Sequence, residues 1–217
     1  MGNFRIAVLL FVSLLFLTSP IQAQFLGHLS TARTVPVGGY DLGGYFGVYE
    51  DAFAFFGQFR GGVAEYLDLG VKLGMISLDF AGEGSEGIIL GGDFKYQLFD
   101  ANLEKSSGGF PLDLSIGAGL EFFSVTDFNV FSFGANFCGS RDFTLSKGRV
   151  ITPYARMNLR GQREHVEAGR ADVTDTDFQA GLNPGVSLKV SSNVQILGEL
   201  QFDDNFGFIG GLTYSFY

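Results

Sequence analysis

The chain has 217 residues, a formal net charge of −9, 17% charged residues, 32 Gly, 25 Phe and 8 Tyr. This acidic composition argues against nucleic acid as a partner, because nucleic-acid binding requires a basic patch, and it offers no polybasic surface to anionic lipid. The single cysteine, Cys138, excludes an intramolecular disulfide, so other interactions must stabilise the fold.

The first residues have the three regions of a secretory signal peptide. Arg5 precedes an apolar run at residues 6–17, and small residues follow as far as Ala23. The apolar run is shorter than the ~20 residues that a membrane-spanning helix needs. We therefore expect cleavage after Ala23, which changes the net charge to −10. An N-terminal leader at residues 24–34 and one domain at residues 35–217 would follow.

The remaining chain is rich in residues that favour strands and turns. Period-2 alternation and turn chemistry predict ten strands, with polar or Gly-bearing turns between them. The predicted strands cover residues 37–49, 52–64, 67–80, 87–99, 111–124, 130–145, 150–163, 176–190, 194–203 and 205–217. Consecutive hairpins of this kind make an up-and-down antiparallel meander.

Apolar and polar side chains alternate along most of these strands. One face of the strand at 111–124 carries Leu112, Leu114, Ile116, Ala118, Leu120 and Phe122, and the other carries Asp113, Ser115, Gly117, Gly119 and Glu121. A soluble sandwich shows the same alternation. However, the polar faces are rich in Gly, which weakens a water-facing strand but suits a crowded lumen. The apolar faces also match the ~9–11 residues that cross a bilayer as a tilted strand.

Aromatic residues gather near the ends of the predicted strands, as expected for two interfacial girdles. The predicted girdles contain Tyr40, Tyr96 and Tyr214 at one rim and Phe53, Phe122 and Phe178 at the other. A last strand that pairs with the first would leave no unpaired edge in hydrocarbon. The sequence therefore predicts an all-β fold, a closed transmembrane β-barrel of ten strands, with eight or twelve as alternatives.

The final strand places Phe208, Leu212, Tyr214 and Phe216 on one face. Together with the signal peptide, this pattern resembles the small outer-membrane β-barrel proteins of double-membraned bacteria, over residues 35–217. The resemblance implies location in the bacterial outer membrane, contact with its lipid, periplasmic termini, and insertion by the barrel assembly machinery. It also implies that these four residues form the C-terminal sorting signal, although Tyr217 lies one position beyond it.

Charged residues occupy the predicted lumen face. The basic ones are Arg60, Lys72, Lys95, Arg156, Arg160 and Lys189, and the acidic ones are Asp41, Asp68, Asp93, Asp113, Glu121, Asp177 and Glu199. They could line a pore that selects solutes, or form cross-strand ion pairs in a narrow lumen. We favour the ion pairs, because open porin channels have ~16–18 strands.

Catalysis is a second possibility, carried by His165 in the predicted loop 164–175. The same loop holds Glu164, Glu167, Asp172 and Asp175. General acid–base catalysis needs a histidine held on rigid structure, so we expect no enzyme. We expect no metal site either, because Asp172, Asp175 and Asp177, which could offer oxygen ligands to calcium, lack the EF-hand spacing. His28, in the leader, is expected at the surface.

Two further segments have simple interpretations. Gly38 and Gly39 are followed by no Lys-Ser/Thr pair and no helix, so they indicate a turn and no phosphate loop. Arg141 falls on the outward face of the predicted strand 130–145, where a mid-bilayer arginine costs ~2–4 kcal/mol. We therefore expect either a bulge that shifts the register near Gly139 or a strand that leaves the membrane at Arg141.

The sequence thus predicts a non-enzymatic outer-membrane barrel with a structural role in the envelope and no cofactor. Passage of very small solutes is left open, and so is the oligomeric state. One alternative is a hydrolase at the outer rim. Another is a secreted soluble barrel that binds an apolar ligand, which would require the Phe-rich faces to point inward.

Overall fold

A computed structural model describes residues 27–50, 52–80, 83–101, 111–125, 128–168, 171–202 and 206–217. The predicted signal peptide lies outside these residues. The strands are β1 Tyr40–Tyr49, β2 Ala52–Ala64, β3 Leu67–Phe80, β4 Glu83–Phe99, β5 Asp113–Val125, β6 Phe128–Ser140, β7 Phe143–Thr144, β8 Val150–Ala168, β9 Ala171–Lys189, β10 Val194–Phe202 and β11 Phe206–Phe216. A 3₁₀ turn covers Ser146–Gly148. Among the described residues, no helix is long and apolar enough to cross a membrane.

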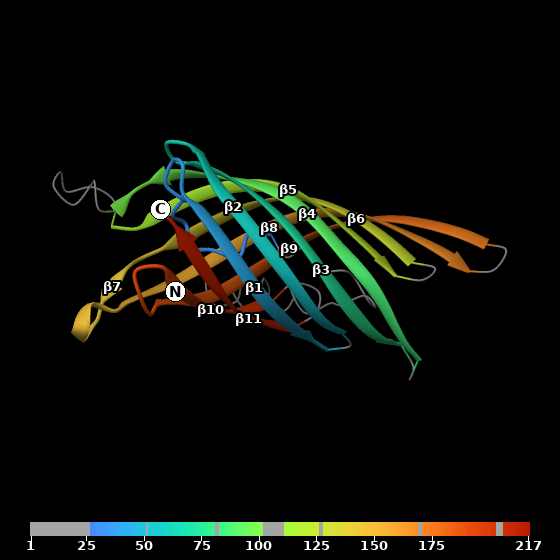
Figure 1. Ribbon diagram of the computed structural model, residues 1–217. Coiled ribbons are helices and arrows are strands. Elements are labelled where there is room, and N and C mark those ends of the chain that lie inside the picture. The colour runs from blue at the N-terminus through green and yellow to red at the C-terminus, as the bar shows by residue number, and fades with distance from the viewer. Residues whose placement is uncertain are drawn as a thin grey trace, which may run out of the picture.

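The strands form one closed antiparallel barrel (Figure 1). Each long strand pairs with its neighbours in the sequence. The barrel is closed by β1 and β11, which pair from Tyr40 opposite Phe216 to Tyr49 opposite Gly207. The two-residue β7 continues β6 along the start of β8, and β6 itself pairs with β8. The predicted barrel of ten strands is therefore confirmed, and its backbone groups find their partners around the ring.

Two local predictions need correction or refinement. The predicted loop 164–175 is wrong, because β8 extends to Ala168 and β9 begins at Ala171, with His165 opposite Thr174. The predicted strand 130–145 is divided, because β6 ends at Ser140. Arg141 lies beyond that end, where its N–H donates to the carbonyl of Pro153. The expected bulge is wrong, because β6 keeps its register with β5 and β8 through Gly139. That the chain leaves the membrane at Arg141 stays a prediction.

The outer surface of the barrel is apolar. Large side chains such as Met75, 68% exposed, and Leu159, 62% exposed, point away from the lumen on every side. Charged and amide side chains, such as Arg60 and Gln162, are buried inside. An apolar surface of this extent belongs against lipid, so the strands cross a membrane. The alternative of a soluble barrel with inward Phe-rich faces is wrong.

The glycines of the lumen face make room for long side chains from the neighbouring strand. A Cβ added at Gly70 would lie 2.5 Å from a guanidinium nitrogen of Arg60, and one at Gly91 would lie 2.9 Å from the Lys72 side chain. The ring of Tyr154 lies across Gly185 in the same way. Large polar side chains can therefore lie flat along the lumen wall.

The two ends of the barrel differ in shape. At the terminal end, where β1 begins and β11 ends, Tyr40 pairs with both Gly61 and Phe216. At the opposite end, here the hairpin end, β8 and β9 continue past their neighbours (Figure 1). The pairing of β10 with β9 reaches only Phe202–Leu182. Residues 171–181 of β9 thus extend beyond the described part of β10.

Candidate functional site

Residues 27–35 lie inside the barrel, and we call this segment the plug. His28, Leu29, Ala32 and Val35 are buried, although the segment belongs to no strand. The described residues that surround it are lumen-facing side chains of β1 to β6 and β8. The chain therefore fills part of its own lumen.

A turn at residues 36–39 connects the plug to β1. The Gly39 N–H donates to the Pro36 carbonyl over 2.9 Å, and Gly38 has φ +78°. Positive φ at the third position defines a type II turn and favours glycine there. The turn interpretation of these glycines is thus supported, and the turn reverses the chain between the plug and β1.

The wall binds the plug mainly through its backbone. Wall donors reach plug carbonyls from Lys72 to Gly27, Arg156 to His28, Tyr45 to Leu29, and Lys95 to Thr31 and Arg33. Wall acceptors take plug N–H groups, with Gln58 bound to Leu29, Ser140 to Ala32, Gln97 to Thr34, and Asp68 to Val35. These contacts satisfy backbone groups that would otherwise be buried without partners.

Arg33 is the charged side chain of the plug. Its guanidinium lies 3.0 Å from Asp113 and 2.7 Å from Asp142, a residue between β6 and β7. The Arg33 side chain is partly exposed, whereas that of Asp113 is buried. These two contacts fix the C-terminal part of the plug at the terminal end of the lumen.

The wall itself carries a network of buried ion pairs. Arg60 lies 2.5 Å from Asp68 and 2.6 Å from Asp93, and Lys95 lies 3.4 Å from the same Asp68. Two further pairs join Lys72 to Glu121 and Arg156 to Glu199 across the strands. Buried charges of this kind are tolerated only when they are paired and hydrogen-bonded.

The other predicted lumen charges lie in different surroundings. Arg160 is buried inside the barrel, while Asp41 is half-buried. Lys189 and Asp177 are exposed, because Lys189 ends β9 at the terminal end and Asp177 lies in its projecting part. Lys189 lies on the same face of β9 as the buried Ser187, but at the end of the strand, so its side chain is exposed at the mouth of the lumen.

His28 differs most from its predicted position. It was expected at the surface, but it is fully buried in the plug, and among the residues that the structure describes neither ring nitrogen has a hydrogen-bond partner. The expectation failed because the leader was taken to lie outside the barrel. The backbone contact with Arg156 shows that the residue is held by its carbonyl.

The predicted catalytic candidates do not converge. His165 Nδ1 lies 3.3 Å from Thr174 Oγ1 on the facing strand, in an exposed position. Glu164, the residue before His165 on β8, points to the opposite face, where the side chain of Gln162 donates a hydrogen bond to its carboxylate over 2.7 Å. Among the described residues, no group of three His, Cys, Asp or Glu side chains could hold a metal ion.

The aromatic residues predicted as girdles are exposed on the outer surface. Tyr40, Tyr96 and Tyr214 lie near the terminal end, where Tyr96 pairs with Leu67 and Tyr214 with Val194. Phe53, Phe122 and Phe178 lie toward the hairpin end. Phe208, Leu212, Tyr214 and Phe216 share the outer face of β11.

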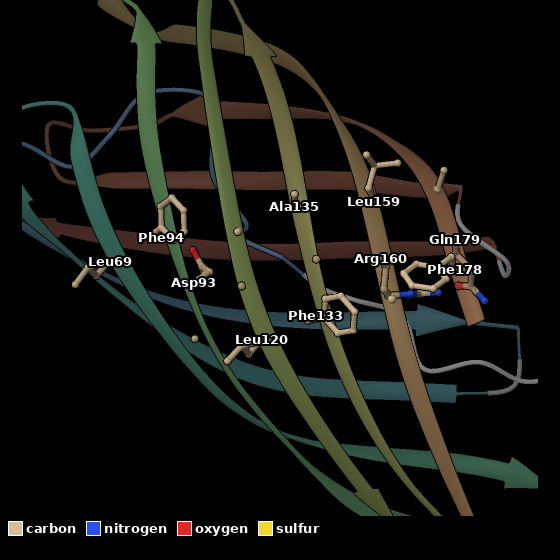
Figure 2. Close-up of a pocket in the computed structure, with 16 residues that line it drawn as sticks. Leu69, Asp93, Phe94, Leu120, Phe133, Ala135, Leu159, Arg160, Phe178 and Gln179 are labelled. Atoms are coloured by element: carbon tan, nitrogen blue, oxygen red, sulfur yellow. The ribbon is translucent and has the colours of Figure 1, made fainter. Parts of the chain in front are cut away.

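A shallow hollow of about 960 Å³ lies on the outer surface across β3 to β6, β8 and β9 (Figure 2). Its rim consists of the exposed side chains of Leu69, Phe94, Leu120, Phe133, Leu159 and Phe178. Small residues, including Ala118 and Ala135, form its floor. Asp93, Arg160 and Gln179 also border it. Because the exposed rim is apolar, the hollow faces the hydrocarbon of the membrane.

The plug is the feature that sequence reasoning missed. Residues 24–34 have neither alternation nor turn chemistry, so no pattern separated them from an ordinary leader. The available signals were the small side chains from Ser30 to Ala32, which fit a narrow space, and the turn before β1. That turn directs the preceding chain back along the barrel.

No family model matches the sequence, and no curated protein matches it. Among solved structures, the N-terminal β-barrel domain of Pseudomonas aeruginosa OprF is 9% identical, with 83% of this chain and 98% of that chain covered and a TM-score of 0.41. The outer membrane protein AlkL in lipid bilayers is 11% identical, with 90% and 97% covered and a TM-score of 0.44. The KdgM porin is 11% identical, with 82% and 99% covered and a TM-score of 0.41. At these scores the likenesses carry no information on what this chain binds or does.

Proposed function

We propose that this chain is a bacterial outer-membrane β-barrel with a structural role in the envelope, and that its plug closes the lumen to solutes. The observation that carries this proposal is the contrast between an apolar outer surface and a lumen in which Leu29 and Ala32 of the plug are buried. Such a barrel is anchored in lipid by its wall.

The outer-membrane location draws support from the closed barrel and from the sequence. A signal peptide ending at Ala23 would export the chain. The outward row of Phe208, Leu212, Tyr214 and Phe216 on β11 suits recognition by the barrel assembly machinery. The terminal end of the barrel would then face the periplasm.

A non-enzymatic role is also part of the proposal. His165 contacts a threonine on the outer face, and its neighbour Glu164 belongs to the inner face. A histidine general base needs an orienting partner on the same side. His165 and Glu164 therefore do not form the histidine–carboxylate pair that the hydrolase alternative would need.

Gel mobility and bilayer conductance together test this function. We expect the protein in the membrane fraction, with a mobility that shifts on boiling because a closed barrel resists cold detergent. Purified protein in planar bilayers should show no channel steps. Recovery in the soluble fraction without detergent would contradict the membrane assignment, and regular conductance steps from the intact protein would contradict closure by the plug.

A further inference from the structure

The lumen recognises the plug as an extended peptide. Its contacts go to backbone carbonyl and N–H groups along residues 27–35, as with Lys72 and Gly27 at 2.6 Å or Asp68 and Val35 at 2.9 Å. Backbone contacts of this kind bind any chain in the same conformation. A second peptide of similar shape could therefore occupy the same place.

Side chains set limits on which peptide fits. Thr31 and Ala32 are buried, so larger residues at these positions would collide with the wall. Arg33 adds charge recognition through Asp113 and Asp142. The site therefore suits an extended peptide with small residues followed by an arginine.

The charges of the wall would keep partners if the plug left. Arg60 would retain Asp68 and Asp93, and Lys95 would retain Asp68. The pairs Lys72–Glu121 and Arg156–Glu199 also involve wall residues alone. Water can replace the backbone groups of the plug at the remaining donors and acceptors. Removal of the plug therefore leaves none of these wall cations without a carboxylate.

We propose that the lumen is a binding site for an extended, arginine-bearing peptide, that residues 27–35 occupy it as an exchangeable plug, and that the barrel conducts when the site is empty. This inference rests on the proposed function, since it requires a barrel that spans a membrane. The peptide enters from the terminal end with its N-terminus leading, because the plug runs in that direction from Arg33 toward Gly27.

The first test deletes residues 27–34 and measures conductance in planar bilayers. The deletion variant should keep its heat-dependent mobility shift and should show channel steps that the intact protein lacks. A synthetic peptide with the sequence of residues 24–37, added on the side of the terminal end, should close these channels. The same peptide with Arg33→Glu should require a concentration at least about tenfold higher, because it places a carboxylate beside Asp113 and Asp142.

A second variant keeps the test decisive if the deletion prevents folding. Arg33→Glu in the full chain turns two attractions into repulsions but leaves the wall unchanged, and it should produce intermittent channel steps. Arg149→Glu is the matched control, because Arg149 is exposed just before β8 at the same end. It should leave the protein silent.

The outcomes separate this inference from the function on which it rests. An intact protein without membrane association or mobility shift would refute the proposed function. If the intact protein is folded and silent, and the folded Arg33→Glu variant is as silent as Arg149→Glu, the exchangeable plug is refuted. Equal block of the deletion variant by both peptides would refute recognition through Arg33.

Discussion

The lumen around the plug and the projecting end of the β8–β9 hairpin are both polar inner faces, yet they are organised differently. Around the plug, Arg60 and Lys95 share the carboxylate of Asp68, and all three side chains are buried. At the hairpin end, the register places Glu164 directly opposite Asp175. Asp175 is exposed to solvent.

This difference shows that pairing, more than charge content, separates a filled interior from an open mouth. Opposite charges that meet in a low dielectric bind each other strongly, and their loss is costly. Like charges directly opposite on neighbouring strands are tolerated only where water screens them. The inner face is therefore a packed core near the terminal end and a solvated surface at the hairpin end.

The largest expected effect comes from breaking the ion pairs around the plug. Arg60→Met removes the cation that binds both Asp68 and Asp93 and leaves these carboxylates buried. We expect the free energy of unfolding to fall by about 3–5 kcal/mol. The folded fraction on unboiled gels across a urea series measures this change.

Arg163→Met is the control for that substitution, because Arg163 is exposed on β8. It should change stability by no more than about 0.5 kcal/mol. Equal losses in the two variants would mean that the buried ion pairs contribute nothing beyond a surface arginine.

A smaller effect is expected where the plug leaves the lumen. A Cβ at Gly62 would collide with the carbonyl oxygens of Val35 and Pro36, whereas a Cβ at Gly44 would meet nothing within 4 Å. Gly62→Ala should therefore destabilise the protein by about 1–3 kcal/mol through overpacking. Gly44→Ala should be nearly neutral in the same urea series. A neutral Gly62→Ala would show that the plug moves aside without cost.

The sequence predicted the barrel because alternation is a local property of each strand. Leu120 and Glu121 reveal their opposite faces by position alone, and the structure places Leu120 outside and Glu121 inside. Strand ends were harder to predict. β8 continues to Ala168 and β9 begins at Ala171, although both ends are rich in polar residues, because polar side chains do not prevent two strands from pairing.

The plug could not be predicted in the same way. His28 and Ala32 are buried only because the wall from several distant strands surrounds them. Backbone recognition leaves little trace in the sequence of the bound segment, since carbonyl and N–H groups are common to all residues. Charged wall residues such as Lys72 and Arg156 were predicted in the lumen, whereas uncharged ones such as Gln58 were not. The role of both kinds as ligands of a peptide backbone depends on tertiary contacts.

The smallest expected effect tests whether removing a carboxylate stabilises the hairpin end but destabilises the lumen around the plug. Asp175→Asn removes one of the two like charges that face each other at the hairpin end, so it should stabilise the protein by about 0.2–1 kcal/mol. The gain should shrink at high salt, because exposed charges are screened.

Asp93→Asn makes the same chemical change beside Arg60, where the carboxylate lies 2.6 Å from the guanidinium and is buried. This variant should lose stability, and salt should alter the loss little. Urea series at low and high ionic strength compare the two variants. If both substitutions changed stability in the same direction, the inner face would behave as one environment, and the distinction between a packed core and a solvated mouth would have to be abandoned.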